Sequence, residues 1–142
     1  MGVAGFPVIL IIAAIAIPNL LRARIAANES SAVASLRTIA TAESSYSSSH
    51  PDLGYTCSLA ALGEAGLIDD NLALGQRTGY RFEITGCDSE GLGGANKYKA
   101  VAYPLTVNQT GKRAFCMDES AVIRQDSGGL PRRCLKNGVA LR

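Results

Sequence analysis

Apolar and polar positions follow two different patterns in the first fifty residues of the chain. Residues 8–17 are apolar without a break, and from Leu21 to Tyr46 apolar residues recur with the spacing of one face of a helix. No Gly or Pro interrupts the chain between Pro18 and Pro51, so the second pattern predicts a single amphipathic helix that Pro51 ends. Pro18 removes one backbone hydrogen bond, and we expect a kink or a loosened turn where the two patterns meet.

The amphipathic helix should bury its apolar face against a sheet. At about 1.5–3 kcal/mol for each buried side chain, that face would be the main source of cohesion in the domain. The residues expected on it are Leu21, Ile25, Val33, Leu36 and Ile39. The polar residues in the intervals are Arg22, Asn28, Glu29, Ser35 and Arg37. An amphipathic helix leaves such polar positions to solvent.

The second half of the chain has shorter patterns that are typical of strands. Alternation of apolar and polar residues predicts a strand at 80–85, and 98–103 is the second predicted strand, ended by Pro104. Residues 112–117 and 121–124 predict a hairpin. One long helix followed by three or four antiparallel strands is an α+β arrangement.

Ser58 and Gly63 bracket a short predicted helix, with the serine as its N-terminal cap and the glycine as its stop. This helix belongs to the connection between the long helix and the first strand. We therefore divide the chain into an apolar stem (residues 1–18), the amphipathic half of the long helix (19–50) and a C-terminal part (51–142). The last two should form one globular domain.

The apolar stem admits three interpretations. A membrane-spanning helix needs about 20 apolar residues, whereas residues 3–17 would cover only about 22 Å of roughly 30 Å of hydrocarbon. A cleaved secretory signal fits the length, and Ala14-Ile15-Ala16 has the small-x-small form of a cleavage site, but no Lys or Arg precedes the apolar run. The third interpretation is a continuous helix that begins in a membrane and runs into the domain, and the helical pattern after Pro18 supports it.

The cysteines indicate disulfides in an oxidising compartment, with free buried thiols as the alternative. They are Cys57, Cys87, Cys116 and Cys134, and the chain has one His and no Cys-x-x-Cys pair, so a zinc site is not expected. Four cysteines allow three pairings. The order of the elements favours Cys57 with Cys87, which would tie the connecting loop to the first strand, and Cys116 with Cys134, which would staple the C-terminal tail.

Charge and motifs argue against several classes of function. The formal net charge is +2, with 14 basic residues scattered among 12 acidic ones, so no specific nucleic acid is expected as a partner. The one local excess is the basic tail with Arg132, Arg133, Lys136 and Arg142, which we interpret as solvated surface. The chain has no Gly-x-Ser-x-Gly, no phosphate-loop spacing and no ladder of metal ligands. We therefore expect no enzyme, no cofactor and no metal site.

The residues on both sides of Pro18 resemble the N-terminal helix of type IV pilins and of the pseudopilins of type II secretion. The similarity covers roughly residues 8–48 and rests on the apolar run that ends in Ala-Ile-Pro-Asn at 16–19 and continues as LLRARIAANE at 20–29. It implies an extended helix whose C-terminal half packs on an antiparallel sheet. The N-terminal half would lie in the inner membrane before assembly and in the filament core afterwards. The stem residues to which this applies are Val8, Ile9, Ile11, Ile12, Ile15, Ile17 and Pro18.

The start of the chain departs from the family. Gly5 and Phe6 resemble the processing junction, but Leu10 stands where the family has Glu, the spacing from Phe6 to Pro18 is shorter, and no basic residue precedes the junction. We expect a truncated or misassigned start rather than a divergent copy that the processing peptidase leaves intact. Restoring the missing residues would also bring the apolar segment to spanning length.

Two classes of function remain. The first is a structural filament subunit, a type IV pilin or alternatively the major pseudopilin of a type II secretion system. The resemblance gives it copies of itself, the inner membrane and the assembly machinery as partners, and the cell surface (pilus) or the periplasm (pseudopilus) as its destination. The second is an exported binding or enzymatic domain with a cleaved signal peptide. Similarity on both sides of Pro18 favours the first class, and two disulfides favour the pilin within it.

Overall fold

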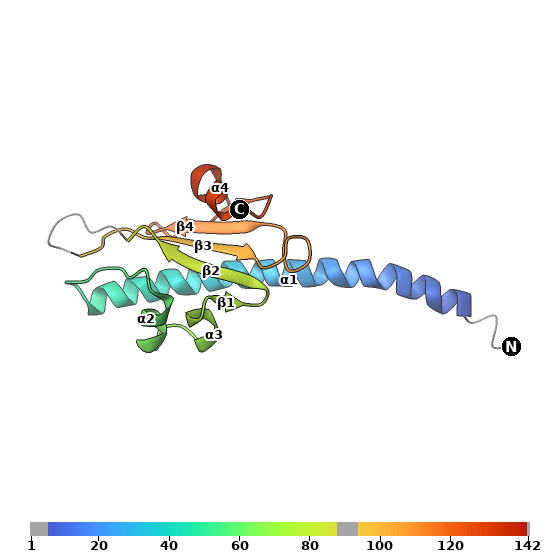
Figure 1. Ribbon diagram of the computed structural model, residues 1–142, viewed down its shortest axis with the longest axis horizontal. Coiled ribbons are helices and arrows are strands. Elements are labelled where there is room, and N and C mark those ends of the chain that lie inside the picture. Colours follow the sequence, from blue (N-terminus) through green and yellow to red (C-terminus); the bar gives the residue numbers. More distant parts are fainter. Residues whose placement is uncertain (1–5, 88–93, 142) are drawn as a thin grey trace.

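The computed structural model describes residues 6–87 and 94–141 and has an α+β fold, in which one long helix lies along an antiparallel sheet (Figure 1). Helix α1 (Phe6–Ser49) has 44 residues and is continuous through Pro18. Its last turn is closed by the amide of His50, which donates to the Tyr46 carbonyl oxygen. The predicted long helix and its end before Pro51 are confirmed.

From Pro18 on, where burial along α1 is described, the first buried residue is Ile25, which is 6% exposed, and Leu36 and Ile39 are completely buried. The prediction for Leu21 is wrong: this residue is 42% exposed, because it lies in the turn before Ile25. Some of the polar positions are also different from the expectation. Asn28, Glu29 and Ser35 are buried, although the amphipathic pattern left them to solvent.

The sheet has six strands, more than the three or four predicted, and every strand pairs antiparallel with the next one along the chain. The strands are β1 (Gln76–Arg77), β2 (Tyr80–Thr85), β3 (Lys99–Pro104), β4 (Ala114–Asp118), β5 (Arg124–Asp126) and β6 (Val139–Ala140). β2 and β3 form the longest pairing, with a register that runs from Tyr80 opposite Pro104 to Thr85 opposite Lys99. The result is a simple meander.

Two strand boundaries differ from the predicted ones. Pro104 does not stop β3 before it but is its last residue. β5 starts later than the expected strand at 121–124, because the chain is still turning at Ala121, which has φ 63° and donates its amide to the Asp118 carbonyl oxygen.

Three short helices complete the domain. α2 (Leu59–Glu64) is capped by the Ser58 hydroxyl, as predicted, but it continues through Gly63 and ends at Glu64. α3 (Asp70–Ala73) follows and is capped by the Asp69 carboxylate. The basic tail was expected to be solvated surface, and Arg132, Arg133 and Lys136 are exposed. The tail also contains helix α4 (Pro131–Asn137), which contacts β3, β4 and β5, and the strand β6 that pairs with β5, and neither element was predicted.

The two faces of the sheet carry different layers (Figure 1). On one face Ala100, Ala102, Phe115 and Met117 pack in a core with α1, α2 and α3. On the other face a smaller cluster joins Val101 and Cys116 of the sheet to Cys134 of α4. The alternation of a strand therefore explains why one sheet can hold a helix on each side.

Both disulfides are present, with the pairing that the order of the elements favours. Cys57–Cys87 ties the loop after α1 to the end of β2, and Cys116–Cys134 fixes α4 on β4. The second bridge is completely buried, whereas Cys57 in the first one is exposed. Each closes a loop in the unfolded chain, which typically stabilises a small domain by about 2–4 kcal/mol.

Candidate functional site

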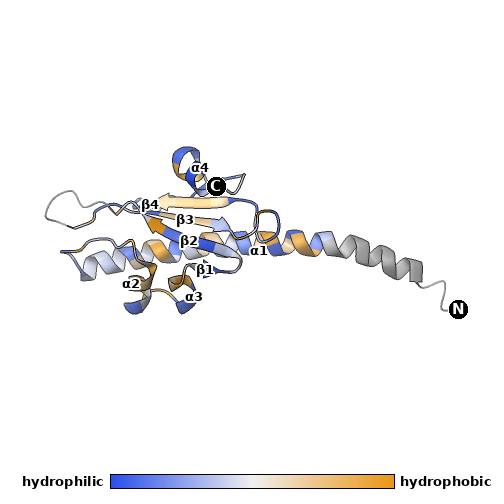
Figure 2. Cartoon of the chain, viewed as in Figure 1, coloured by the Kyte–Doolittle hydropathy of each residue, from blue (hydrophilic) through white to orange (hydrophobic). Residues whose placement is uncertain are grey.

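The most unusual surface of the molecule is the part of α1 that precedes Ile25. All seven residues from 18 to 24 are exposed, including Leu20 at 64% and Leu21 at 42%, and we call this segment the exposed extension. Figure 2 shows its apolar residues where the helix stands clear of the sheet. An isolated helix with apolar side chains on its surface lacks the partner that would remove them from water.

The predicted stem residues continue this segment toward the N-terminus. Phe6 is the first residue of α1, the residues from Val8 to Ile17 lie in its first turns, and Pro18 opens the exposed extension. Gly5, the other half of the predicted processing junction, lies outside the described residues. Among the helices that the structure describes, none combines the length and the apolar character that crossing a bilayer requires.

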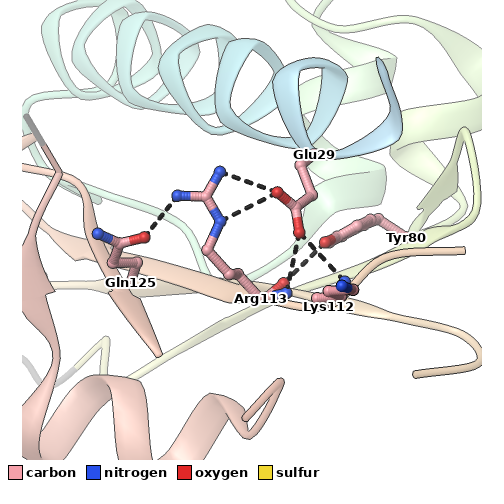
Figure 3. A network of polar contacts seen from close by, with 5 residues as sticks. All are labelled: Glu29, Tyr80, Lys112, Arg113 and Gln125. Atoms are coloured by element: carbon pink, nitrogen blue, oxygen red, sulfur yellow. Dashed lines mark hydrogen bonds and ion pairs between the residues drawn. The ribbon is translucent and has the colours of Figure 1, made fainter. Parts of the chain in front are cut away.

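Glu29 fastens α1 to the sheet one turn after the exposed extension ends (Figure 3). Its Oε1 accepts hydrogen bonds from the backbone amides of Lys112 and Arg113, both at 3.1 Å. Its Oε2 lies 3.0 Å from Nε and 2.8 Å from the terminal guanidinium nitrogen of Arg113. The guanidinium also donates to the Gln125 side chain of β5. Glu29 is 8% exposed, and its carboxylate has four donors, two of which belong to the Arg113 guanidinium. These donors offset the loss of its hydration.

Two further contacts hold the same end of the domain together. The side-chain amide of Asn28 donates to the Thr110 carbonyl oxygen at 3.0 Å, and the Tyr80 hydroxyl donates to the Arg113 carbonyl oxygen at 2.7 Å. Burial and the nearby Glu29 carboxylate raise the pKa of Tyr80, so its hydroxyl keeps the proton that it donates. The segment before β4 is therefore attached both to α1 and to β2.

Glu43 is a second buried carboxylate of α1, and its surroundings are different. It is completely buried. Its Oε1 accepts one hydrogen bond, from the Thr56 amide at 3.0 Å, and its Oε2 has no hydrogen-bond partner within the described ranges 6–87 and 94–141. Burial raises the pKa of Glu43 to about 7, against a smaller opposite effect of the Thr56 amide. The adjacent Tyr98 also has a raised pKa, because of its own burial and then the Glu43 charge.

The sequence contains a signal for both carboxylates that the amphipathic pattern did not use. Six buried residues of α1 follow one another at alternating spacings of four and three residues. They are Ile25, Glu29, Ala32, Leu36, Ile39 and Glu43. These spacings place all six on one helix face. A carboxylate at an apolar position of such a helix face predicts a buried acid that needs a cation or several hydrogen-bond donors. Arg113 is such a cation for Glu29 but not for Glu43.

Among the side chains that the structure describes, no three of the types His, Cys, Asp and Glu lie close enough together to hold a metal ion. The lone His50 lies against the ring of Tyr46, with centroids 4.3 Å apart, and its Nδ1 is 3.1 Å from the Tyr46 carbonyl oxygen. What the arrangement offers is a firmly anchored helix with a free apolar end.

Comparisons with models of known protein families, with curated proteins and with solved structures found no match.

Proposed function

We propose that the chain is a non-enzymatic structural subunit of a helical filament of the type IV pilin kind. One observation carries the proposal: α1 is a single helix whose later part is packed on the sheet while its exposed extension, next to an unbroken apolar run, has no partner within the described chain. Identical helices can supply that partner by packing around a common axis, because each buries the apolar surface of its neighbours.

The anchor at Glu29 supports the same proposal. A subunit that transmits load through its stem needs a rigid connection between the stem and the domain, and Glu29 makes this connection immediately after the exposed extension. The two disulfides fit a fibre outside the cytoplasm, where thiols are oxidised. Membrane residence before assembly, and the assembly machinery as a partner, belong to the proposal through the resemblance to pilins.

The proposal predicts a difference between the full chain and a chain that begins at Arg24. The shorter chain retains Ile25 and every described buried residue after it, so it should fold and remain monomeric in water. The full chain should need detergent as a monomer and should assemble when the detergent is removed. Sedimentation velocity and negative-stain electron microscopy measure both outcomes.

A full chain that stays monomeric in water without detergent would contradict the proposal. The alternative of an exported domain with a cleaved signal has its own test. N-terminal sequencing of the exported protein would then show cleavage after Ala16. Within the filament class we favour a pilus over the pseudopilus of a type II secretion system because of the two disulfides, and immunogold labelling of fibres on the cell surface would separate the two.

A further inference from the structure

The exposed extension carries two cations without a partner. Arg22 and Arg24 are exposed, and neither forms an ion pair in the part of the chain that the structure describes. They stand next to the exposed Leu20 and Leu21. The surface thus combines apolar and positively charged side chains, and a complementary surface would combine apolar residues with free carboxylates.

Most of the described acidic residues are already engaged within the subunit. Four of them form ion pairs, namely Glu29, Asp69, Glu83 and Asp126. Asp118 accepts hydrogen bonds from Ser120, and Glu43 is buried. The exposed acidic residues that remain in the described ranges are Asp52, Glu64, Asp70 and Glu119. Only two of these four, Glu64 and Asp70, line a common groove.

The groove lies between α2 and α3 and has a volume of about 410 Å³. Apart from the two carboxylates, it is lined by Ala60, Gly63, Ala73 and Leu74. Leu74 is the most exposed of the large apolar side chains described, at 83%. Small residues leave room for a side chain to enter, and the carboxylates can then pair with cations beside it.

The position of the groove along α1 determines how a second copy would reach it. Leu67, which follows α2, lies beside the turns of α1 from Arg37 to Ser45, so the α2 and α3 region is near the level of Thr41 (Figure 1). Arg22 and Arg24 precede Thr41 by about 18 residues, or roughly 27 Å of helix. A parallel copy displaced by about that distance brings its two arginines to the level of the groove. Such a contact joins different surfaces and can repeat without closing, as a filament requires.

We propose that Arg24 of one copy binds the groove between α2 and α3 of a neighbouring copy, where it pairs with Glu64 or Asp70 while Leu20 or Leu21, which lie on the same helix face as Arg24, contacts Leu74. This inference rests on the proposed filament and names the surface that a neighbour uses. The contact adds charge specificity to helix packing that is otherwise apolar and non-directional, so it selects one stagger among several.

Charge reversal in the full chain tests the contact. The double variant Arg22→Glu with Arg24→Glu should raise the concentration needed for filament assembly about tenfold, and Glu64→Lys with Asp70→Lys should do the same. The four substitutions together restore opposite charges and should return assembly to near the original concentration. Pelleting of filaments over a concentration series measures this, and the melting temperature of each chain beginning at Arg24 verifies that the domain variants fold.

The matched control is Asp52→Lys with Glu119→Lys, which changes the net charge by the same amount at two exposed acids outside the groove. It should leave assembly unchanged. Filaments that form equally well with either charge-reversed pair, or a fourfold variant that assembles no better than the two pairs, would overturn the inference but leave the proposed function standing. Absence of filaments from the unaltered chain would instead overturn the proposed function, and the inference with it.

Discussion

Glu29 and Glu43 lie on the same face of α1 and are both buried, yet the hydrogen-bond donors and charges around the two carboxylates are different. Glu29 has four donors, two of them from the Arg113 guanidinium. Glu43 has one backbone donor and no cation, and one of its oxygens has no partner among the described residues. The difference shows that burial by itself does not decide the state of a carboxylate. The donors and the charge that meet it decide.

The two residues also act on different ends of the domain. Glu29 attaches α1 to the segment before β4, close to the exposed extension. Glu43 attaches α1 to Thr56, next to Cys57 and its disulfide to Cys87. The first attachment includes an ion pair with Arg113, whereas the second is one hydrogen bond to a carboxyl group whose pKa is raised to about 7. Replacing each residue should therefore change stability by different amounts and with different dependence on pH.

The largest effect is expected from Glu29→Ala. The substitution leaves the amides of Lys112 and Arg113 without an acceptor and the guanidinium without its charge partner. Breaking such an arrangement costs about 3–5 kcal/mol when it is fully buried. Because the Arg113 side chain is 37% exposed and water can reach it, we expect a loss of about 3 kcal/mol, measured by urea unfolding of the chain that begins at Arg24. A loss below about 1 kcal/mol would contradict the anchoring role.

A smaller effect is expected from the pH, through Glu43. Most carboxylates in folded proteins add stability as the pH rises, whereas Glu43 should lose stability. Its pKa is raised from 4.5 to about 7 in the folded chain, so between these values the folded state binds more protons than the unfolded state. The stability that Glu43 contributes is therefore fully present below pH 4.5 and is lost as the pH rises to about 7. Above about pH 7 no further loss comes from this group. At about 1.4 kcal/mol for each pKa unit, reduced by water that enters on ionisation, we expect a loss of about 2 kcal/mol.

The variant Glu43→Gln is the control for this pH dependence. It retains an oxygen for the Thr56 amide and cannot ionise, so its stability should vary less between pH 5.5 and 8.5 than that of the unaltered chain. Burial keeps the pKa of the neighbouring Tyr98 well above this range, and Tyr55 and His50 are present in both proteins. Parallel pH profiles for the two proteins would show that Glu43 does not take up the proton.

Asn28→Ala should have a more modest effect at the Glu29 end. Asn28 is 9% exposed and makes one described side-chain hydrogen bond, to the Thr110 carbonyl oxygen. Loss of one such bond costs about 1 kcal/mol. Thermal unfolding should thus place this variant between the unaltered chain and Glu29→Ala. A larger loss than for Glu29→Ala would reverse the order of importance proposed here for the two contacts.

The smallest effect is expected for Ser35→Ala. The Ser35 hydroxyl is buried and has no hydrogen-bond partner in the described part of the chain. Its removal gives up no described hydrogen bond, removes an unsatisfied polar group and improves helix propensity. We expect a change within about 0.5 kcal/mol of zero or a small gain in stability by urea unfolding. A clear loss would mean that the hydroxyl has a partner, such as a bound water.

Periodicity allowed most of the fold to be predicted, but only where the elements are long. The long helix follows from a spacing of 3.6 residues, with Pro51 marking its end, and the strand around Phe82 follows from a spacing of 2 residues. β1 and β6 have two residues each, too few for any period to show. Their formation depends on a neighbouring strand that is already in place, which sequence patterns do not describe.

The basic tail was missed for a different reason. The charges of Arg132, Arg133 and Lys136 indicated solvent, and the first two are indeed exposed along with Lys136. Residues 131–137 nevertheless form α4, because Pro131 is well suited to the first turn of a helix and Cys134 is fixed to β4 by its disulfide. The positive charges correctly indicated that the outer surface of this segment is exposed. They gave no indication that the segment is a helix held on the sheet through Cys134.

The candidate site was predicted only in part. The apolar stem and Pro18 could be recognised as one end of a long helix, but Glu29 was assigned to solvent with the other polar residues, and no prediction was made for Glu43. Arg113 is 84 residues away from Glu29 in the chain. No local pattern reveals such a pair, since only the register of the sheet brings the two side chains together.

The chain order of the six strands also has a consequence for how the domain is built. Every pairing in the meander joins successive strands, so each pairing can form as soon as its second strand has been synthesised. The contacts that α1 makes with β3, with β4 and with the segment before β4 join residues much farther apart, such as Glu29 and Arg113, which are 84 residues apart. During synthesis the amphipathic helix emerges before β3 and β4, which pack on it, so part of its apolar face is uncovered until these strands have been made. The chain is thus most exposed to premature association before its translation is complete.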